Sequence, residues 1–139
     1  MNYETLLRDH HLKVTSQRLG ILSLMNTYGH ISIEDLFIQI KREFSSISLA
    51  TLYKNINAML DNKLISEVNI PQLKCKYEIS KTPHAHLLCD NCGEFKDINI
   101  DLDALIKTTE KTSHYKVNNT NMIFSGLCEK CKELTEENS

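Results

Sequence analysis

Apolar residues recur at helical spacing in three stretches of the first half of the chain. A threonine or serine that can cap a helix precedes each stretch, which predicts helices over residues 15–28, 32–44 and 48–60. Gly29 suits the carboxyl-terminal cap of the first helix. In the third helix, we expect the apolar residues to face inward, namely Leu49, Leu52, Ile56, Met59 and Leu60.

A change to period-two alternation then predicts two strands, Leu64–Ile70 and Lys74–Ile79, which Pro71-Gln72-Leu73 would join. Cys75 occupies an inward position of the second strand, so it is interpreted as a core residue rather than a sensor. Helix, short link, helix and hairpin is the order of a winged helix-turn-helix.

The remaining residues form a smaller, β-rich half. Strands are expected over residues 84–89 and 94–98, an amphipathic helix over 101–113 with Leu102, Leu105 and Ile106 inward, and a strand-like segment over 116–127. The polar residues 129–139 are expected to fray.

The predicted fold class is therefore α+β, with two domains in the 139 residues. A winged-helix DNA-binding domain is expected over residues 1–80, and a small, β-rich, metal-binding domain over residues 81–139. Ser80-Lys81-Thr82-Pro83 reads as a hinge, which we place at about 79–83.

The charge of the chain locates any nucleic-acid role in the first half. Residues 1–80 carry nine basic and eight acidic residues, whereas residues 81–139 carry seven and ten. DNA binding would thus depend on placed contacts rather than bulk charge. The chain has no export signal and no apolar run of membrane-spanning length, so we expect a cytoplasmic protein with reduced thiols and no membrane association.

Two C-x-x-C pairs give the most specific chemical signal: Cys89 with Cys92, and Cys128 with Cys131. Each pair can present two thiolates to one ion, and two pairs complete the tetrahedral sulfur shell that Zn²⁺ favours. Gly93 supplies the backbone freedom of the first turn. Two disulfides or four core thiols are the alternatives. A closed Cys₄ zinc site is structural and performs no chemistry by itself.

The third helix offers a polar face that suits a DNA major groove. Lysine can donate to guanine, asparagine can pair with adenine, and tyrosine or threonine can contact a thymine methyl group. A solvated helix face is the alternative, but a following wing favours DNA reading. The DNA-contact candidates are Ser48, Thr51, Tyr53, Lys54 and Asn55, with Lys13 and Arg18 upstream.

A second group of metal-ligand residues surrounds the Cys89–Cys92 turn. Each C-x-x-C turn of this kind is a zinc knuckle, and this one is the first. His84 and His86 lie two residues apart on a predicted strand, so both imidazoles share one face. Asp97 and Glu78 add carboxylate oxygens, and such a set suits Fe²⁺, Mn²⁺ or Zn²⁺. His30 could join from the helical half, although spacing alone does not bring it there. Scattered polar residues are the alternative.

Several segments together resemble the ferric uptake regulator family of bacterial metal-dependent repressors, over nearly the whole chain. They are Leu12-Lys13-Val14-Thr15-Ser16-Gln17-Arg18, Gly29-His30, Ser46-Ile47-Ser48-Leu49-Ala50-Thr51-Leu52-Tyr53-Lys54-Asn55, Pro83-His84-Ala85-His86-Leu87-Leu88-Cys89-Asp90-Asn91-Cys92-Gly93 and Cys128-Glu129-Lys130-Cys131.

The resemblance implies that residues 81–139 form an α/β dimerisation domain, and that the homodimer binds double-stranded, palindromic operator DNA and uses no organic cofactor. It also implies structural Zn²⁺ on the four cysteines and DNA contacts from Lys13, Tyr53 and Lys54. Lys54 stands where many relatives have arginine. A regulatory Fe²⁺ or Mn²⁺ would lie between the domains, and its implied ligands are His30, Glu78, His84, His86 and Asp97.

The subtype follows from smaller features of the same segments. Iron-sensing members often carry a further ion site. Its ligand positions correspond here to Pro83, Ala85 and Thr120, whose side chains cannot serve as ligands. That difference favours the peroxide-responsive branch. Glu78 stands where peroxide sensors usually have aspartate, which keeps an iron-responsive repressor without peroxide sensing as the alternative.

Two other function classes fit less well. A zinc hydrolase or deaminase would need H-E-x-x-H, or H-x-E followed by P-C-x-x-C, and the chain contains neither, so we expect no enzyme. A zinc-stapled protein-interaction module would show no salt-dependent DNA binding.

Overall fold

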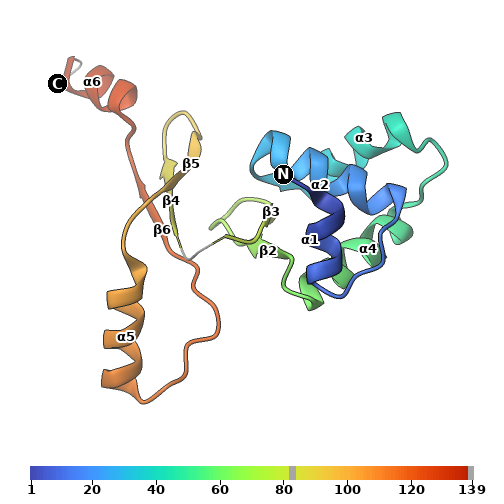
Figure 1. The fold of residues 1–139 in the computed structure, drawn as a ribbon. Helices are drawn as coiled ribbons and strands as arrows, with labels where there is room; N and C mark the ends of the chain where they lie inside the picture. Colours follow the sequence, from blue (N-terminus) through green and yellow to red (C-terminus); the bar gives the residue numbers. More distant parts are fainter. Residues whose placement is uncertain (82–83, 138–139) are drawn as a thin grey trace. The chain divides into compact units, whose positions relative to one another are not determined.

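The computed structural model describes residues 1–81 and 84–137 and divides the chain into two compact units, Met1–Ser80 and Lys81–Ser139 (Figure 1). The predicted hinge at about 79–83 includes residues 82 and 83, which lie outside the described residues. Each unit has its own helices and its own three-stranded sheet.

The helices of the first unit begin where the capping residues predicted. The side-chain oxygens of Thr15, Ser32 and Ser48 each accept a hydrogen bond from the backbone N–H three residues later. Each bond satisfies a donor that the first helical turn would otherwise leave without a partner. The three predicted helices are thereby confirmed as α2 (Ser16–Tyr28), α3 (Ile33–Glu43) and α4 (Leu49–Asp61). The pattern did not predict α1 (Tyr3–Asp9).

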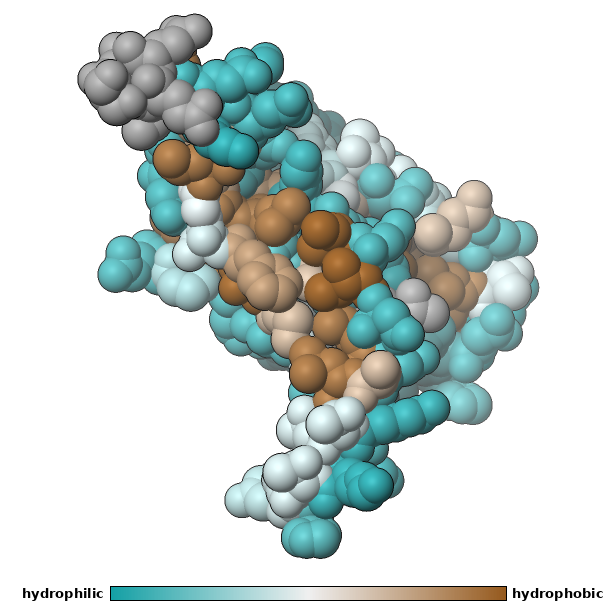
Figure 2. Space-filling model, turned by 90° about the vertical axis from the view of Figure 1, so that its left-hand side faces the viewer, coloured by the Kyte–Doolittle hydropathy of each residue, from teal (hydrophilic) through white to brown (hydrophobic). Residues whose placement is uncertain are grey.

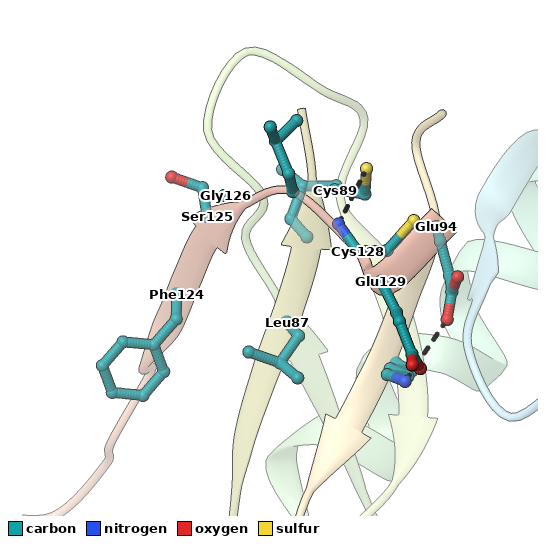
Figure 3. A pocket seen from close by; sticks show the side chains of 11 residues that line it. Leu87, Cys89, Glu94, Phe124, Ser125, Gly126, Cys128 and Glu129 are labelled. Atoms are coloured by element: carbon teal, nitrogen blue, oxygen red, sulfur yellow. Dashed lines mark hydrogen bonds and ion pairs between the residues drawn. The ribbon is translucent and has the colours of Figure 1, made fainter. Parts of the chain in front are cut away.

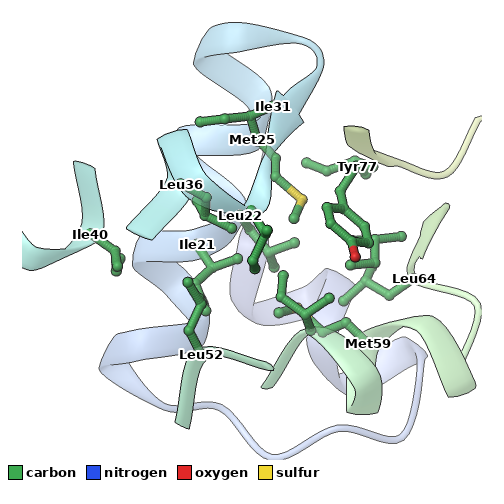
Figure 4. Close-up of a cluster of buried hydrophobic side chains, with 14 of the residues drawn as sticks. Ile21, Leu22, Met25, Ile31, Leu36, Ile40, Leu52, Met59, Leu64 and Tyr77 are labelled. Atoms are coloured by element: carbon green, nitrogen blue, oxygen red, sulfur yellow. The ribbon is translucent and has the colours of Figure 1, made fainter. Parts of the chain in front are cut away.

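One apolar core fills the space between these helices and the sheet of the first unit (Figure 4). In α4, Leu52, Ile56 and Met59 are fully buried, as helical spacing predicted. The prediction that Leu49 faces inward is wrong, because its side chain is 44% exposed. Residues 48–50 are all exposed, so the first turn of α4 lies outside the core.

The sheet of the first unit contains the predicted hairpin and one further strand. β2 (Ile65–Val68) pairs antiparallel with β3 (Lys76–Ile79), and β1 (Ile31–Ser32) pairs with the other edge of β3. Three helices followed by this hairpin form a winged helix-turn-helix. A two-residue strand is too short to give a periodic signal, so the sequence did not predict β1.

Cys75, just before β3, is half-buried and donates a hydrogen bond to Glu67 Oε1 at 3.0 Å. Burial and the adjacent Glu67 carboxylate raise the pKa of the Cys75 thiol to about 12. The thiolate is the reactive form of cysteine. A thiol held protonated in this way agrees with the interpretation of Cys75 as a structural residue.

The second unit has a mixed sheet in the order β5-β4-β6. β4 (Ala85–Cys89) runs antiparallel to β5 (Phe95–Ile98) and parallel to β6 (Ile123–Gly126). The amphipathic helix is confirmed as α5 (Leu102–Ser113), between β5 and β6 in the chain. Of the strand-like residues 116–127, only β6 is extended within a sheet.

The prediction of a frayed end is wrong for residues 129–137, because Glu129–Glu137 form helix α6, and residues 138–139 lie outside the described residues. The amide of Lys132 donates to the carbonyl of Cys128 at 2.8 Å, so the second cysteine pair opens this helix. Residues three apart lie on one face of a helix, which directs Cys128 and Cys131 to the same side.

The second unit leaves many apolar side chains in contact with solvent. Figure 2 shows apolar side chains gathered over one face of this unit. Leu105 of α5 was expected to face inward but is 46% exposed, whereas Leu102 is buried as predicted. The large apolar residues that the unit exposes are Ile100, Leu105, Tyr115, Phe124, Leu127 and Leu134.

A pocket of about 290 Å³ opens on the sheet of the second unit, beside the second cysteine pair (Figure 3). Leu87 of β4 and Phe124 of β6 are register partners and line it together.

Among the described residues, no helix is both long enough and apolar enough to span a bilayer.

Candidate metal centres and nucleic-acid interface

The four cysteines of the two C-x-x-C pairs converge at one end of the second unit. Their sulfur atoms all lie within 4.8 Å of one another, and Cys92 Sγ is 3.8 Å from Cys128 Sγ. A tetrahedron with Zn–S bonds of about 2.3 Å has sulfur–sulfur edges of about 3.8 Å. A disulfide would need about 2.05 Å, and all five cysteines are free thiols. This geometry fits a tetrahedral zinc ion and does not fit the disulfide alternative.

Hydrogen bonds favour the thiolate of Cys89, whereas the contact with the Cys89 sulfur raises the pKa of Cys92 to about 12. Cys89 Sγ accepts backbone N–H bonds from Cys92 at 3.5 Å and from Cys128 at 3.4 Å. These bonds lower the pKa of Cys89 to about 6, which favours the thiolate that zinc requires. Asn91 Nδ2 donates to Cys131 Sγ at 3.2 Å, so the first knuckle also orients a ligand of the second.

Two histidines and one carboxylate of the second unit form a separate cluster. His84 directly precedes β4, His86 lies in β4, and Asp97 lies in β5. His86 and Asp97 are register partners across the two strands, and His86 Nε2 is 3.2 Å from Asp97 Oδ1. His84 Nε2 lies 3.1 Å from His86 Nε2 and 3.6 Å from Asp97 Oδ1. The two imidazoles share one face, as the period of two predicted. Phe95 stacks on His86, with ring centroids 4.9 Å apart.

The Nε2 atoms of His84 and His86 and the Oδ1 atom of Asp97 are spaced like ligands of one ion. Metal–ligand bonds of about 2.1 Å give separations of about 3.0 Å between neighbouring ligands in an octahedral site and about 3.4 Å in a tetrahedral site. Imidazole nitrogens with a carboxylate oxygen suit Fe²⁺, Mn²⁺ or Zn²⁺ better than Mg²⁺ or Ca²⁺. The cluster therefore fits a transition-metal ion.

The first unit carries the other two candidate ligands side by side. His30 Nε2 lies 2.9 Å from Glu78 Oε2. Gly29 ends α2 with φ of 76°, a left-handed conformation that glycine adopts without a steric penalty. The chain then enters β1, whose Ile31 pairs with Tyr77 of β3, and this pairing places His30 beside Glu78. No sequence pattern predicted this proximity, because β1 has only two residues.

The polar face of α4 is smaller than the sequence indicated. Ser48, Tyr53 and Lys54 are exposed, Thr51 is half-buried, and Lys13 upstream is exposed. Ser48 is occupied in capping, since its oxygen accepts from Thr51 N at 3.1 Å. The amino-terminal half of α4 therefore carries a polar surface made by Ser48, Thr51, Tyr53 and Lys54.

Asn55 does not belong to that surface, and the expectation that it is exposed is wrong. Its side chain is 9% exposed and accepts a hydrogen bond from Arg18 Nε at 3.0 Å. It also donates to Gln17 Oε1 and to the carbonyl of Thr51. Arg18 in turn donates through Nη1 to the carbonyl of Lys13 at 3.0 Å. Arg18 and Asn55 thus tie α2 and the preceding loop to α4.

Replacing Asn55 by leucine should lower the free energy of unfolding of the first unit by about 1–3 kcal/mol, because Arg18 Nε–H would lose its buried acceptor. Urea denaturation followed by circular dichroism measures this change. Asn57→Leu is the matched control on an exposed position of α4 and should change stability by less than about 0.5 kcal/mol. Equal effects of the two substitutions would show that the Arg18–Asn55 contact contributes nothing specific.

Comparison with known proteins gives one consistent family. The sequence model of the ferric uptake regulator family matches residues 9–125. The peroxide operon regulator of Bacillus subtilis (strain 168) is 25% identical over 129 residues, which cover 91% of this chain and 89% of that protein.

Solved structures agree with the sequence comparison. A peroxide stress regulator of Campylobacter jejuni is 35% identical with a TM-score of 0.75, over 94% of this chain and all of that chain. The ferric uptake regulator of Vibrio cholerae is 28% identical with a TM-score of 0.70, over 91% of this chain and all of that chain. Peroxide-responsive and iron-responsive relatives thus share one fold with this protein.

Proposed function

Because the chain belongs to the ferric uptake regulator family, we propose that it is a metal-dependent repressor that binds operator DNA as a homodimer. The observation that carries this proposal is the coexistence of a winged helix-turn-helix with two sets of transition-metal ligands outside the Cys₄ cluster. The family is one of transcriptional regulators. A closed Cys₄ ion leaves no position for a reacting water, so we propose no enzymatic activity.

One regulatory ion would use both sets of ligands. His30 and Glu78 of the first unit and His84, His86 and Asp97 of the second supply three imidazoles and two carboxylates. Such a set suits Fe²⁺ or Mn²⁺, and Zn²⁺ would remain on the cysteines. Because the ligands come from two units, binding of the ion would select one relative orientation of the units.

The DNA surface would be the exposed polar face at the start of α4, with Thr51, Tyr53 and Lys54 toward base edges and Ser48 and Lys13 toward phosphates. Asn55 and Arg18 would support this surface by fixing α4 against α2. A lysine point charge gives less geometric selectivity for guanine than an arginine fork.

A second copy of the chain would cover the apolar face of the second unit. Exposed side chains such as Leu105, Phe124 and Leu127 gather on a unit that carries a net negative charge, so a phosphate backbone is a poor partner for it. Two copies joined there would present two α4 helices, and a palindromic operator has matching half-sites about one helical turn apart. The free thiols of the Cys₄ site require a reducing compartment, consistent with the cytoplasm.

The test is an electrophoretic mobility shift with DNA of the chain's own promoter region. The zinc-containing protein should bind in the presence of Mn²⁺, lose binding when Mn²⁺ is removed by a weak chelator, and bind less tightly as salt rises. A dimer mass should be found by light scattering. Binding that ignores Mn²⁺, or a complete lack of DNA binding, would contradict the proposal and favour a protein-interaction module.

Peroxide response is the proposed subtype, and two relatives that carry such a name support it. Hydrogen peroxide would transfer one oxygen atom to an imidazole ring carbon of His30 or His84 and leave as water. The iron ion supplies the redox chemistry of this step when it is bound. The oxidised ring is a poorer ligand, so the ion would be lost and the operator released. The alternative, suggested by Glu78 and by the Vibrio cholerae relative, is an iron-responsive repressor.

Glu78→Asp should raise the sensitivity of the iron-loaded protein to peroxide several-fold, because a shorter carboxylate changes how many of its oxygens reach the ion and opens a coordination position. Mass spectrometry of the peptides with His30 and His84 would measure a gain of about 16 Da, alongside loss of DNA binding. Glu34→Asp, on the exposed surface of α3, is the matched control. No mass gain in either protein would favour the iron-responsive alternative.

A further inference from the structure

Lys81, the first residue of the second unit, contacts the metal-ligand cluster of that unit. Its ammonium Nζ donates to Asp97 Oδ2 at 2.7 Å. The other carboxylate oxygen, Oδ1, faces His86 Nε2 at 3.2 Å and His84 Nε2 at 3.6 Å. One oxygen of Asp97 thus faces the two imidazoles, and the other accepts a hydrogen bond from Lys81.

This ion pair differs from an ordinary surface pair because its carboxylate belongs to a candidate metal ligand. Asp97 is the single carboxylate among the described second-unit residues of the cluster, so its charge is the main attraction there for a divalent cation. An ammonium at 2.7 Å neutralises that charge and repels a second cation. The Lys81 side chain is 48% exposed, so it can leave the carboxylate for water at small cost.

We propose that Lys81 is an internal competitor for the regulatory ion, which holds Asp97 in the ion-free protein and is displaced when Fe²⁺ or Mn²⁺ binds. This inference rests on the proposed function of the His84, His86 and Asp97 cluster. The competitor weakens the affinity of the site for the ion. A higher ion concentration is therefore needed to occupy the site than if Lys81 were absent. Lys81 is therefore an affinity-determining residue that is not itself a ligand.

Lys96 provides a matched control. It precedes Asp97 in β5, carries the same charge, and lies 3.5 Å from Glu94 rather than on the cluster. The substitutions Lys81→Gln and Lys96→Gln remove one positive charge each from the same neighbourhood. Only the first removes a contact to a candidate ligand, so their difference separates competition from long-range electrostatics.

The experiment is calorimetric titration of Mn²⁺ into the zinc-containing full chain. Lys81→Gln should lower the Mn²⁺ dissociation constant about threefold to fivefold, as expected for removal of a half-exposed ion pair. Lys96→Gln should change it by less than about twofold, and Lys81→Arg should keep the affinity within about twofold of the unsubstituted protein. Unchanged or weaker Mn²⁺ binding by Lys81→Gln overturns the inference.

Chemical labelling gives a second readout that does not depend on affinity. Acetic anhydride should modify Lys81 faster after Mn²⁺ is added, because the displaced ammonium faces water, while Lys96 in the same sample keeps its rate. Equal rates at Lys81 with and without Mn²⁺ contradict displacement. His86→Ala separates failure of the proposed regulatory site from failure of the proposed role of Lys81. If His86→Ala leaves Mn²⁺ binding unchanged, the regulatory site is wrong, and the role of Lys81 is wrong with it.

Discussion

Replacing Cys89 by serine is expected to abolish zinc retention and to unfold the second unit while the first unit stays folded. The Cys89 sulfur accepts one backbone hydrogen bond from its own knuckle, at Cys92, and one from the other knuckle, at Cys128. Structural zinc contributes about 10–16 kcal/mol of binding free energy in small zinc-dependent domains. That exceeds the stability of a typical small domain, about 5–15 kcal/mol, over most of its range.

The two units should respond differently because their cores differ. The first unit has a core of fully buried side chains on four helices, for example Leu22, Leu36 and Ile56. In the second unit, the described large apolar residues that are buried are few, and Leu102 is the main one on α5. Without its ion, that unit has little apolar burial to offset the conformational entropy of folding.

Metal analysis and an amide NMR spectrum together measure the outcome. The Cys89→Ser protein should contain no zinc, and the amide signals of β4, β5 and β6 should collapse to unfolded positions while those of α2 to α4 persist. Cys75→Ser is the control, since it removes a thiol whose partner is Glu67 and should keep its zinc. A zinc-free Cys89→Ser protein with an intact second unit would show that the ion is dispensable for folding.

Local signals explain why so much of the fold was predictable. Capping residues at 15, 32 and 48 fixed the starts of three helices, because each side chain bonds the backbone within its own turn. The doubled C-x-x-C spacing predicted a four-sulfur cluster for a similar reason. Each knuckle is a local structure, and only the meeting of the two required the fold.

The incorrect expectations arose where contacts distant in sequence decided the outcome. Asn55 has the spacing of an exposed residue on α4, but Arg18, 37 residues earlier, supplies a partner that buries it. His30 meets Glu78 through the short strand β1, which has no periodic signal. Leu105 follows the inward face of α5 and yet is exposed, as expected if a second subunit rather than this chain covers it.

His86→Ala should raise the Mn²⁺ concentration needed for half-maximal operator binding by at least about a hundredfold. His86 is the central member of its cluster, because its Nε2 lies 3.1 Å from His84 Nε2 and 3.2 Å from Asp97 Oδ1. Loss of a residue that merely supports a ligand typically costs about 10–100-fold in metal affinity, so loss of a ligand should cost at least as much. Mobility shifts over a Mn²⁺ series measure the change.

Zinc content and folding must be unchanged for this result to concern regulation. His86 lies apart from the four cysteines, so the variant should keep one zinc per chain and a folded second unit. His114→Asn is the matched control, because His114 is an exposed left-handed cap of α5 that asparagine tolerates, and it should retain normal Mn²⁺ dependence. If His86→Ala keeps normal Mn²⁺ dependence as well, the ion acts elsewhere, and a switch that joins the two units through this cluster does not exist.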